Sequence, residues 1–439
     1  MRKLYYFLVL LLIFLTCFWL QAETDFLPYH NFFQLRSALI QITGLISVTL
    51  MSIAMLLAMR LRFIERQTHG LDKSFRLHKH LGIASVTMAI VHWLLAIIPK
   101  YLVQWQLLAR PEKGNGPFNE QSLYSLIKPL RGIAESIGEY SFYGFVILVA
   151  ISLLSAIKYK NFKITHRLIS ICFLAIAFHS AILIKHAYWP YPITYIALTF
   201  ITLGSCAALW SLFGQIGKSK QHSATIVSAT YNAINKVLDL TLQTPNWHGH
   251  KSGQFAFIQF PGEEAHPFTI ASADHQQGKL SFLIKELGDF TSKLKEHVSV
   301  GQQVKVEGPY GCFNFAEAGP QLWIAGGIGI AAFKAILQER GKISSYQKVV
   351  LYYCTETPDN DFLHTLQAQA TQANVTLKVI NNRLDPFLTV TQLNKELGNI
   401  TQYKIWFCGP TKFSHALKCD LKTLNYDLHH FHEELFEMR

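Results

Sequence analysis

The sequence predicts a helical transmembrane bundle followed by two soluble domains, an antiparallel β-barrel and a doubly wound α/β domain. Of the 439 residues, 50% are hydrophobic and only 15% are charged, whereas soluble domains usually carry about 25% charged residues. The long apolar stretches lie almost entirely before residue 214. After residue 217 the chain shows short alternating segments, glycine turns and mixed charge. We therefore expect three domains, at residues 1–217, 218–317 and 318–439, with a linker at 218–223.

Six apolar stretches are long enough to be membrane helices, because a bilayer core needs about 20 residues per helix. The first also fits a signal peptide cleaved after Ala22, since basic residues precede an apolar run. We expect a retained helix and keep cleavage as the alternative. The six candidates are residues 4–20, 34–59, 78–98, 140–157, 166–187 and 193–213.

Basic residues give the bundle an orientation. Lysines and arginines gather after the second, fourth and sixth candidate helices, and this bias marks the cytoplasmic side. The soluble half then follows the sixth helix into the cytoplasm. The same placement accounts for the net charge of +12 without a nucleic-acid partner, because no basic stripe interleaved with aromatics is present. The basic residues concerned are Arg60, Arg62, Arg66, Lys73, Arg76, Lys158, Lys160, Lys163, Lys218 and Lys220.

Histidines within the apolar stretches indicate a metal or haem site, because ionisable side chains are costly in hydrocarbon. His78 and His92 lie on the third candidate helix, and His166 and His179 lie on the fifth. These helices run parallel, and spacings of 14 and 13 residues correspond to about 21 and 20 Å. Two histidine pairs at two depths could each ligate a haem iron from both sides. Seven scattered cysteines without a paired CxxC spacing favour neither zinc, an iron–sulfur cluster nor disulfides.

The angular spacing leaves one assignment open. At about 100° per residue, His78 and His92 share a helix face, whereas His166 and His179 lie about 140° apart. A helix distortion would bring His179 into line, and His186 shares a face with His179 more closely. His80 and His186 lie near helix ends, where a packing role is the simpler interpretation. Arg36, near the outer end of the second helix, is a candidate for holding a haem propionate or an anionic product, or is an interface arginine.

The soluble half changes pattern near residue 317. Four strand candidates suit a small antiparallel barrel, and the strands and helices that follow alternate as in a doubly wound domain. Gly326, Gly327 and Gly329 join the first of these strands to a helix, and such a turn lets a pyrophosphate approach the backbone. The barrel candidates are 237–241, 255–260, 280–284 and 303–307. The α/β candidates are 322–325, 331–340, 349–354, 361–370, 377–380 and 405–408.

Several motifs, taken in order, resemble those of the NADPH oxidase and ferric reductase superfamily. Residues 266–272 (HPFTIAS) resemble its flavin-binding motif, and residues 287–294 (LGDFTSKL) resemble the next, diphosphate-binding segment. Residues 306–311 (VEGPYG) match the end of its barrel, and residues 408–410 (CGP) resemble its nicotinamide-side motif. The tail 432–436 (HEELF) resembles the segment whose aromatic covers the flavin ring. The histidine spacings of 14 and 13 also match, and the resemblance covers roughly residues 34–439.

The resemblance implies a ferredoxin-reductase-like module that binds FAD and NAD(P)H, after a bundle that binds two b-type haems. The implied haem ligands are His78, His92, His166 and His179. The implied FAD contacts are His266, Pro267, Phe268, Thr269, Ser272, Lys285, Gly288, Asp289, Phe290, Thr291 and Phe436. The implied NAD(P)H contacts are Gly326, Gly327, Gly329, Cys408, Gly409 and Pro410, with Cys408 and Phe436 in catalytic roles.

The expected activity is electron transfer from cytoplasmic NAD(P)H through FAD and the haems to an acceptor outside a bacterial inner or plasma membrane. The first candidate acceptor is O2, which would give superoxide. The alternative acceptor is a ferric or cupric ion, reduced by the same electron path. A different class is a transporter or receptor whose soluble half senses nucleotide. The preference between NADH and NADPH stays open, because residues 355–357 (TET) stand where many NADPH users have a basic residue, with Arg383 as a possible substitute. A further alternative is a membrane subunit that passes electrons to quinone or to a periplasmic protein, and the sequence does not identify a protein partner.

Overall fold

The computed structural model describes residues 2–23, 28–29, 31–109, 127–154, 159–275, 277–342 and 347–434. The chain divides into two compact units, which we describe separately. The first comprises Met1–Ile64 and Lys73–Ile216, and the second comprises Glu65–Asp72 and Gly217–Arg439.

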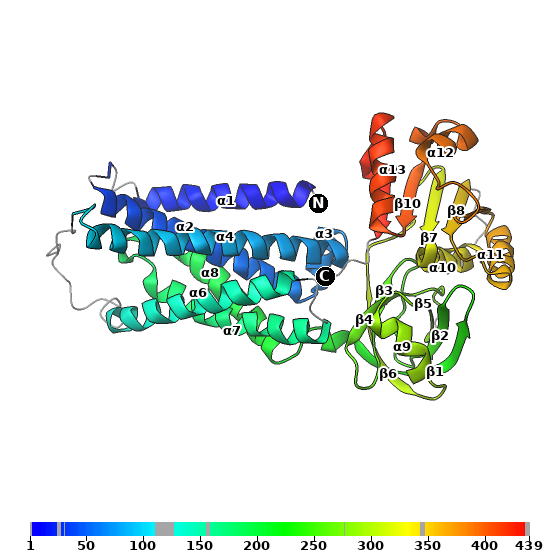
Figure 1. Ribbon diagram of the computed structural model, residues 1–439, viewed down its shortest axis with the longest axis horizontal. Coiled ribbons are helices and arrows are strands. Elements are labelled where there is room, and N and C mark those ends of the chain that lie inside the picture. Colours follow the sequence, from blue (N-terminus) through cyan, green and yellow to red (C-terminus); the bar gives the residue numbers. More distant parts are fainter. Residues whose placement is uncertain are drawn as a thin grey trace. The chain divides into compact units, whose positions relative to one another are not determined.

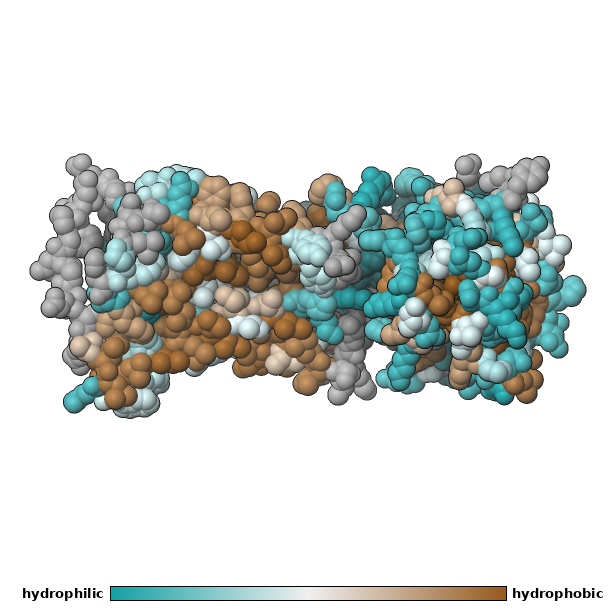
Figure 2. Space-filling model, turned by 90° about the horizontal axis from the view of Figure 1, so that it is seen from above, coloured by the Kyte–Doolittle hydropathy of each residue, from teal (hydrophilic) through white to brown (hydrophobic). Residues whose placement is uncertain are grey.

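The first unit is a helical bundle (Figure 1). Among the described residues, six helices are long and apolar enough to cross a membrane. Figure 2 shows hydrophobic residues over much of the visible face of these helices, as a lipid-facing surface requires. The helices are α1 (Arg2–Glu23), α2 (Phe32–Ala58), α4 (Leu71–Gln104), α6 (Arg131–Leu153), α7 (Tyr159–Leu183) and α8 (Pro192–Leu212), with the short α3 (Arg62–Thr68) between α2 and α4.

Several helix boundaries predicted from hydropathy are wrong, including those of the third candidate, 78–98, which is the longer α4 (Leu71–Gln104). The fourth candidate, 140–157, is α6, which begins at Arg131 and ends at Leu153. Its first turns carry charged residues that lower the hydropathy, and Arg131 and Glu135 are among the residues that line a cavity in the bundle. The fifth candidate, 166–187, is α7, which ends at Leu183, so His186 falls in a separate 3-10 turn, η3 (His186–Tyr188).

Helix α1 packs as an element of the bundle. Leu15 and Ala22 are completely buried, and the indole Nε1 of Trp19 donates to the Tyr188 hydroxyl at 3.1 Å. The buried carboxylate of Glu23 pairs with the Lys185 ammonium at 3.0 Å. These contacts hold α1 against the segment between α7 and α8.

The second unit begins with a six-stranded antiparallel sheet in the order β4-β3-β6-β1-β2-β5. An antiparallel bridge between Ile270 and Phe282 joins the chain after β4 to β5, which closes the sheet into a barrel. Ile226, Leu240 and Phe282 are fully buried in its core. The strands are β1 (Gln221–Asn232), β2 (Val237–Gln243), β3 (Phe255–Gln259), β4 (Ala265–Thr269), β5 (Lys279–Lys285) and β6 (Gln303–Tyr310), with helix α9 (Asp289–His297) before β6.

Two barrel strands were not predicted from the sequence. Strand β1 begins at Gln221, inside the expected linker 218–223, and its many polar residues hide the alternation. Strand β4 contains Pro267, a residue that argues against a central strand. Proline is tolerated there because β4 lies at an end of the hydrogen-bonded strand order.

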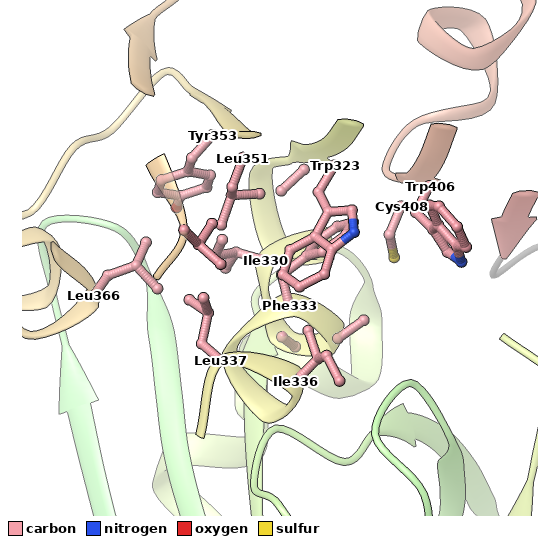
Figure 3. Packing of buried hydrophobic residues seen from close by; sticks show 14 of the residues in the cluster. Trp323, Ile330, Phe333, Ile336, Leu337, Leu351, Tyr353, Leu366, Trp406 and Cys408 are labelled. Carbon is pink, nitrogen blue, oxygen red and sulfur yellow. The ribbon is translucent and has the colours of Figure 1, made fainter. Parts of the chain in front are cut away.

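The rest of the second unit is a parallel five-stranded sheet in the order β11-β10-β7-β8-β9. One buried cluster covers each face, and Figure 3 shows Trp323 and Phe333 of one cluster packed together, with Cys408 beside Trp406. The elements are β7 (Gln321–Gly326), α10 (Ile330–Arg340), β8 (Val349–Thr355), α11 (Asn360–Gln372), β9 (Thr376–Asn381), α12 (Val390–Leu397), β10 (Lys404–Cys408), α13 (Thr411–Thr423) and β11 (Phe431–Glu434). Helices α12 and α13 and strand β11 were not among the predicted elements.

Candidate functional site

Two histidine pairs lie between α4 and α7. The ring centres of His78 and His166 are 5.7 Å apart, and those of His92 and His179 are 6.3 Å apart. The structure thus pairs the histidines that lie at the same depth along α4 and α7. This includes His179, whose pairing was left open because an ideal helix places it about 140° from His166. His186 lies outside α7, with its ring centre 6.2 Å from that of Trp189.

The hydrogen bonds of these histidines fix their tautomers. Nδ1 of His78 lies 2.8 Å from the carbonyl oxygen of Ala54, and Nδ1 of His179 lies 2.8 Å from that of Ala134. Nδ1 of His92 lies 3.0 Å from the carbonyl oxygen of Ile40. A carbonyl only accepts, so each Nδ1 carries the proton and each Nε2 keeps a free lone pair.

His166 reaches the same state through a hydroxyl. Its Nδ1 lies 3.1 Å from Oγ of Ser152, and that hydroxyl donates to the carbonyl oxygen of Leu148 at 2.7 Å. Because the Ser152 proton is used on Leu148, the oxygen accepts from Nδ1–H of His166. All four histidines therefore present an unprotonated Nε2, which is the state of an axial ligand with an oriented second shell.

Glycines make room for the pair His92 and His179. A β-carbon on Gly138 would lie 2.0 Å from Nδ1 of His179, and one on Gly44 would lie 3.1 Å from Cε1 of His92. Real β-carbon contacts essentially never fall below 3.0 Å. Gly138 is thus required by the observed position of His179, whereas Gly44 permits a close contact.

The pair geometry fits a bis-imidazole haem site. A metal–imidazole nitrogen bond is about 2 Å and the ring centre lies about 1 Å beyond the nitrogen, so opposite ligands have centres about 6 Å apart. Both measured separations agree with this value. The donor set, two neutral imidazoles at each of two levels, suits haem iron held in six-coordinate form.

A cavity of about 490 Å³ lies inside the bundle, with His92 and His179 in its lining. Most of its lining is apolar, and five charged residues join it. Arg36 donates from Nε to the carbonyl oxygen of Leu95 at 2.7 Å and from a terminal nitrogen to that of Ala96 at 3.0 Å. Arg36 is therefore anchored to α4 beside the cavity and does not extend freely to the interface. The charged lining residues are Arg36, Lys100, Arg131, Glu135 and Glu139.

In the barrel, the structure brings two of the expected flavin residues into contact. The rings of His266 on β4 and Phe290 on α9 stack with centres 3.9 Å apart and planes 7° apart. Pro267, Phe268 and Thr269 complete β4 beside His266. Ser272 has a structural contact, because its Oγ accepts from the backbone N–H of Ser281 at 3.1 Å.

The expected diphosphate segment forms a turn that leads into α9. Oγ1 of Thr291 accepts from the backbone N–H groups of Leu287 at 2.9 Å and Gly288 at 3.1 Å. These two N–H groups are therefore already bonded to the Thr291 hydroxyl. Helix α9 starts at Asp289, and no atom lies within 4 Å of a β-carbon built on Gly288. An anionic group fits this open helix start. Lys285 ends β5 two residues before the turn.

The glycine turn after β7 has a packing reason that the sequence did not show. A β-carbon on Gly329 would lie 2.0 Å from the carbonyl oxygen of Cys408, and one on Gly326 would lie 2.7 Å from Cδ of Pro410. One on Gly409 would lie 3.0 Å from Gly326. The glycines at the ends of β7 and β10 thus let the two expected NAD(P)H motifs approach each other. Gly327 has a φ of +54° and open space around it.

Cys408 is completely buried at the end of β10. Burial, together with the nearby Glu434 carboxylate, raises the pKa of its thiol well above the usual value. The thiol is therefore neutral and is not a thiolate nucleophile. Glu434, opposite Cys408 in the β10–β11 pairing, is a buried carboxylate that we had not selected from the sequence, although the tail motif contains it. Phe436 lies outside the described residues.

Comparison with known proteins identifies two regions. Residues 43–177 match the model of a ferric reductase like transmembrane component, and residues 222–314 match that of an FAD-binding domain. The first match lies in the bundle that carries the paired histidines, and the second lies in the barrel that carries the expected flavin motif.

Curated relatives match part of the chain. The reductase component of propane 2-monooxygenase from Rhodococcus jostii is 28% identical over 185 residues, which are 38% of this chain and 50% of the relative. The ferredoxin–NAD(P)+ reductase component of the naphthalene 1,2-dioxygenase system from Pseudomonas putida is 25% identical over 231 residues, or 49% and 70% of the two chains. The chain spans only half the length of the first of these relatives.

Solved structures also match part of the chain. A ferredoxin reductase in carbazole 1,9a-dioxygenase has 19% identity and a TM-score of 0.41, covering 49% of this chain and 69% of that chain. A ferredoxin NADP+ reductase from Neisseria gonorrhoeae with bound FAD and NADP has 16% identity and a TM-score of 0.41, covering 49% and 98%.

Proposed function

The chain joins a ferric-reductase-like transmembrane component to an FAD-binding domain, the architecture of the NADPH oxidase and ferric reductase superfamily, and from this premise we propose that it is a transmembrane oxidoreductase. It takes electrons from NAD(P)H, uses FAD and two b-type haems, and delivers the electrons to an acceptor on the other side of the membrane. The bound flavin would accept a hydride and release single electrons, which six-coordinate haems carry one at a time.

The observation that carries this proposal is the state of the four bundle histidines. Each presents a free Nε2, because Ala54, Ile40, Ala134 and Ser152 hold the Nδ1 protons. A histidine that only packs has no need for this arrangement at two levels on the same pair of helices. His78 and His166 would hold one haem, and His92 and His179 would hold the other.

In the second unit, residues 218–317 form the proposed FAD domain and residues 318–439 the proposed NAD(P)H domain. Phe268 and Thr269 would meet the flavin ring region, and His266 with the start of α9 would hold the phosphates. The glycine turn at 326–329 would receive the pyrophosphate of the nicotinamide nucleotide. The neutral Cys408 would lie at the nicotinamide, and Phe436 would cover the flavin.

The basic residues after α2 and α8 favour a cytoplasmic second unit, in a bacterial inner or plasma membrane. His92 and His179 would then lie toward the outside, next to the cavity. The mainly apolar lining of that cavity suits O2, a small neutral acceptor, with superoxide as the product. Ferric or cupric reduction is the second candidate, because Glu135 and Glu139 in the lining are groups that attract cations.

Spectroscopy on the purified full-length protein tests the proposal. The protein should show a low-spin haem b spectrum that changes to the reduced form when NAD(P)H and FAD are added without oxygen. His92→Ala and His179→Ala should each remove one of the two haems. His186→Ala, a histidine outside the pairs, is the matched control and should keep both haems. Unchanged haem content in the first two variants would overturn the ligand assignment, and a purified protein without haem absorbance would favour a transporter or receptor.

The acceptor is decided by a second measurement on the same protein. Oxygen consumption that releases superoxide, detected by its sensitivity to superoxide dismutase, would support the oxidase. Reduction of a ferric chelate that persists without oxygen and in the presence of the dismutase would support the metalloreductase.

A further inference from the structure

The carboxyl ends of β8 and β9 form a corner next to the proposed pyrophosphate site. Thr355 pairs with Asn381 in the parallel register, and the N–H of Asn382 donates to the carbonyl oxygen of Thr355 at 2.9 Å. The adjacent register pairs Gly326 of the glycine turn with Cys354. In a doubly wound sheet, ligands bind at the carboxyl ends of the strands. The segments 355–357 and 381–385 therefore lie where the adenosine ribose of a dinucleotide would bind.

This corner is strongly acidic. The segments 355–361 and 381–385 carry four carboxylates and one guanidinium, a formal charge of −3. Glu356 is exposed at the end of β8, and Arg383 is the one cation of the two segments. The acidic residues are Glu356, Asp359, Asp361 and Asp385.

Glu356 is the exposed carboxylate that directly follows β8, whereas Asp361 lies further on, in the first turn of α11. Asp359 is buried and accepts from the N–H of Phe362 at 2.8 Å and from Asn232 at 2.9 Å. Asp385 accepts from the N–H of Asn381 at 3.0 Å, which closes its turn. Lys378 on β9 does not compensate the charge, because Glu396 holds it at 2.5 Å.

Two further oxygens at the corner need donors. Oγ1 of Thr357 and Oδ1 of Asn382 are shielded from water, and within the residues that the structure describes neither has a hydrogen-bond partner. A ribose hydroxyl can donate a hydrogen bond, and a carboxylate at this place is the usual partner of the ribose diol. A phosphate monoester carries a charge of about −1.5 to −2 at pH 7 and offers mainly acceptors. A 2′-phosphate at this place would be repelled by the nearby Glu356 carboxylate, and Arg383 is the one cation of the two segments that could compensate the negative charge.

We propose that this corner selects NADH over NADPH, and that Glu356 is the specificity-determining residue. The selection acts on the adenosine ribose and leaves the hydride transfer at the nicotinamide unchanged. This inference rests on the proposed function, because it requires the α/β domain to take a nicotinamide dinucleotide.

The experiment compares the two nucleotides on the full-length flavin-loaded protein. Anaerobic flavin reduction in a stopped-flow instrument should give NADH a kcat/KM at least about 10-fold above that of NADPH, a ratio equal to about 1.4 kcal/mol. Glu356→Gln and Glu356→Arg should raise kcat/KM for NADPH, with the larger gain for arginine. Asp420→Asn removes an exposed carboxylate on α13 of the same domain and should leave the ratio unchanged.

A binding measurement separates this inference from the proposed function. ADP-ribose should bind the wild-type protein more tightly than 2′-phospho-ADP-ribose, and Glu356→Arg should reverse the order. Equal or tighter binding of the 2′-phosphorylated probe to the wild type would overturn the selection while leaving the oxidoreductase intact. Failure of both nucleotides to reduce the flavin, in protein that retains its flavin and haem absorbance, would instead overturn the proposed function.

Discussion

Nδ1 of His179 lies 2.0 Å from the position that a β-carbon on Gly138 would occupy. The two helices that carry them, α6 and α7, therefore approach as closely as they do only because residue 138 has no side chain. The carbonyl of Ala134, one turn earlier on α6, accepts the Nδ1 proton of the same histidine at 2.8 Å. Helix α6 thus both makes room for His179 and orients it.

Gly138→Ala should remove the outer haem and keep the inner one. The added methyl group must displace His179, because no rotation of a methyl avoids a 2.0 Å contact. The pyridine haemochrome content should fall to one haem per chain, with the His78–His166 haem still reducible by the nucleotide. Gly132→Ala is the control on the same helix, because no atom lies within 4 Å of its β-carbon. Two haems retained in Gly138→Ala would contradict the packing argument.

Ser152→Ala should weaken the inner haem. The Ser152 oxygen accepts from Nδ1–H of His166, and loss of such an outer partner of a metal-bound histidine typically costs about 10–100-fold in affinity. Haem retention during dilution in detergent, and the reduction potential of the inner haem, are the measurements. Ser136→Ala removes an exposed serine of α6 whose hydroxyl donates to the carbonyl oxygen of Gly132 on the same helix, and it should change neither.

Much of this architecture could be predicted from the sequence, because it depends on periodicity and composition. The six apolar stretches, the two sheets and the paired histidines follow from patterns that local residues carry. The level of His179 was predictable from the helical rise, but its pairing with His92 was not, since an ideal 100° step places His166 and His179 about 140° apart. The contact of Gly329 with Cys408, which joins segments far apart in the chain, has no signal in a single sequence.

Polar residues explain the elements that were missed. The start of α6 was missed because the charged residues Arg131 and Glu135 lower the hydropathy there. Both residues line a cavity, and hydropathy alone cannot distinguish such residues from those of a loop. Pro267 hid β4 because its tolerance depends on the position of that strand in the sheet order. Glu434 was not selected because its significance comes from burial next to Cys408, which only the pairing of β10 with β11 reveals.

Gly329→Ala should abolish reduction by the nucleotide while sparing the other cofactors. A β-carbon there would lie 2.0 Å from the Cys408 carbonyl oxygen, so the ends of β7 and β10 must separate. The residues proposed to contact the nicotinamide and the pyrophosphate would then no longer be correctly spaced for one nucleotide. The flavin of the variant should still bind and accept electrons from dithionite, with the haem spectrum unchanged. Gly341→Ala, at the end of α10, would meet the flexible side chain of Gln372 at 3.3 Å and the carbonyl oxygen of Leu337 at 3.4 Å, and it should behave as wild type. Normal NAD(P)H reduction in Gly329→Ala would show that the turn tolerates displacement.

His250 should make the stability of the barrel depend on pH. Its Nε2 lies 2.8 Å from the carbonyl oxygen of Ser272, and its Nδ1 accepts from the indole N–H of Trp247 at 3.2 Å. Both ring nitrogens are therefore satisfied in the neutral form. Burial lowers the pKa of His250 below its usual 6.5, so the unfolded chain binds the proton first as the pH falls.

The stability that neutral His250 contributes is therefore full above pH 6.5 and declines as the pH falls toward the folded-state pKa, by at most about 1.4 kcal/mol per pH unit for one proton. The temperature of flavin release, followed by fluorescence between pH 8 and pH 5, should fall on the acid side in the wild type. The slope should be smaller in His250→Gln, because glutamine does not titrate, whereas His415→Gln, at an exposed position on α13, should keep the wild-type slope. Equal slopes in wild type and His250→Gln would assign the acid sensitivity to another group, because the only change between them is the imidazole that Ser272 and Trp247 hold neutral.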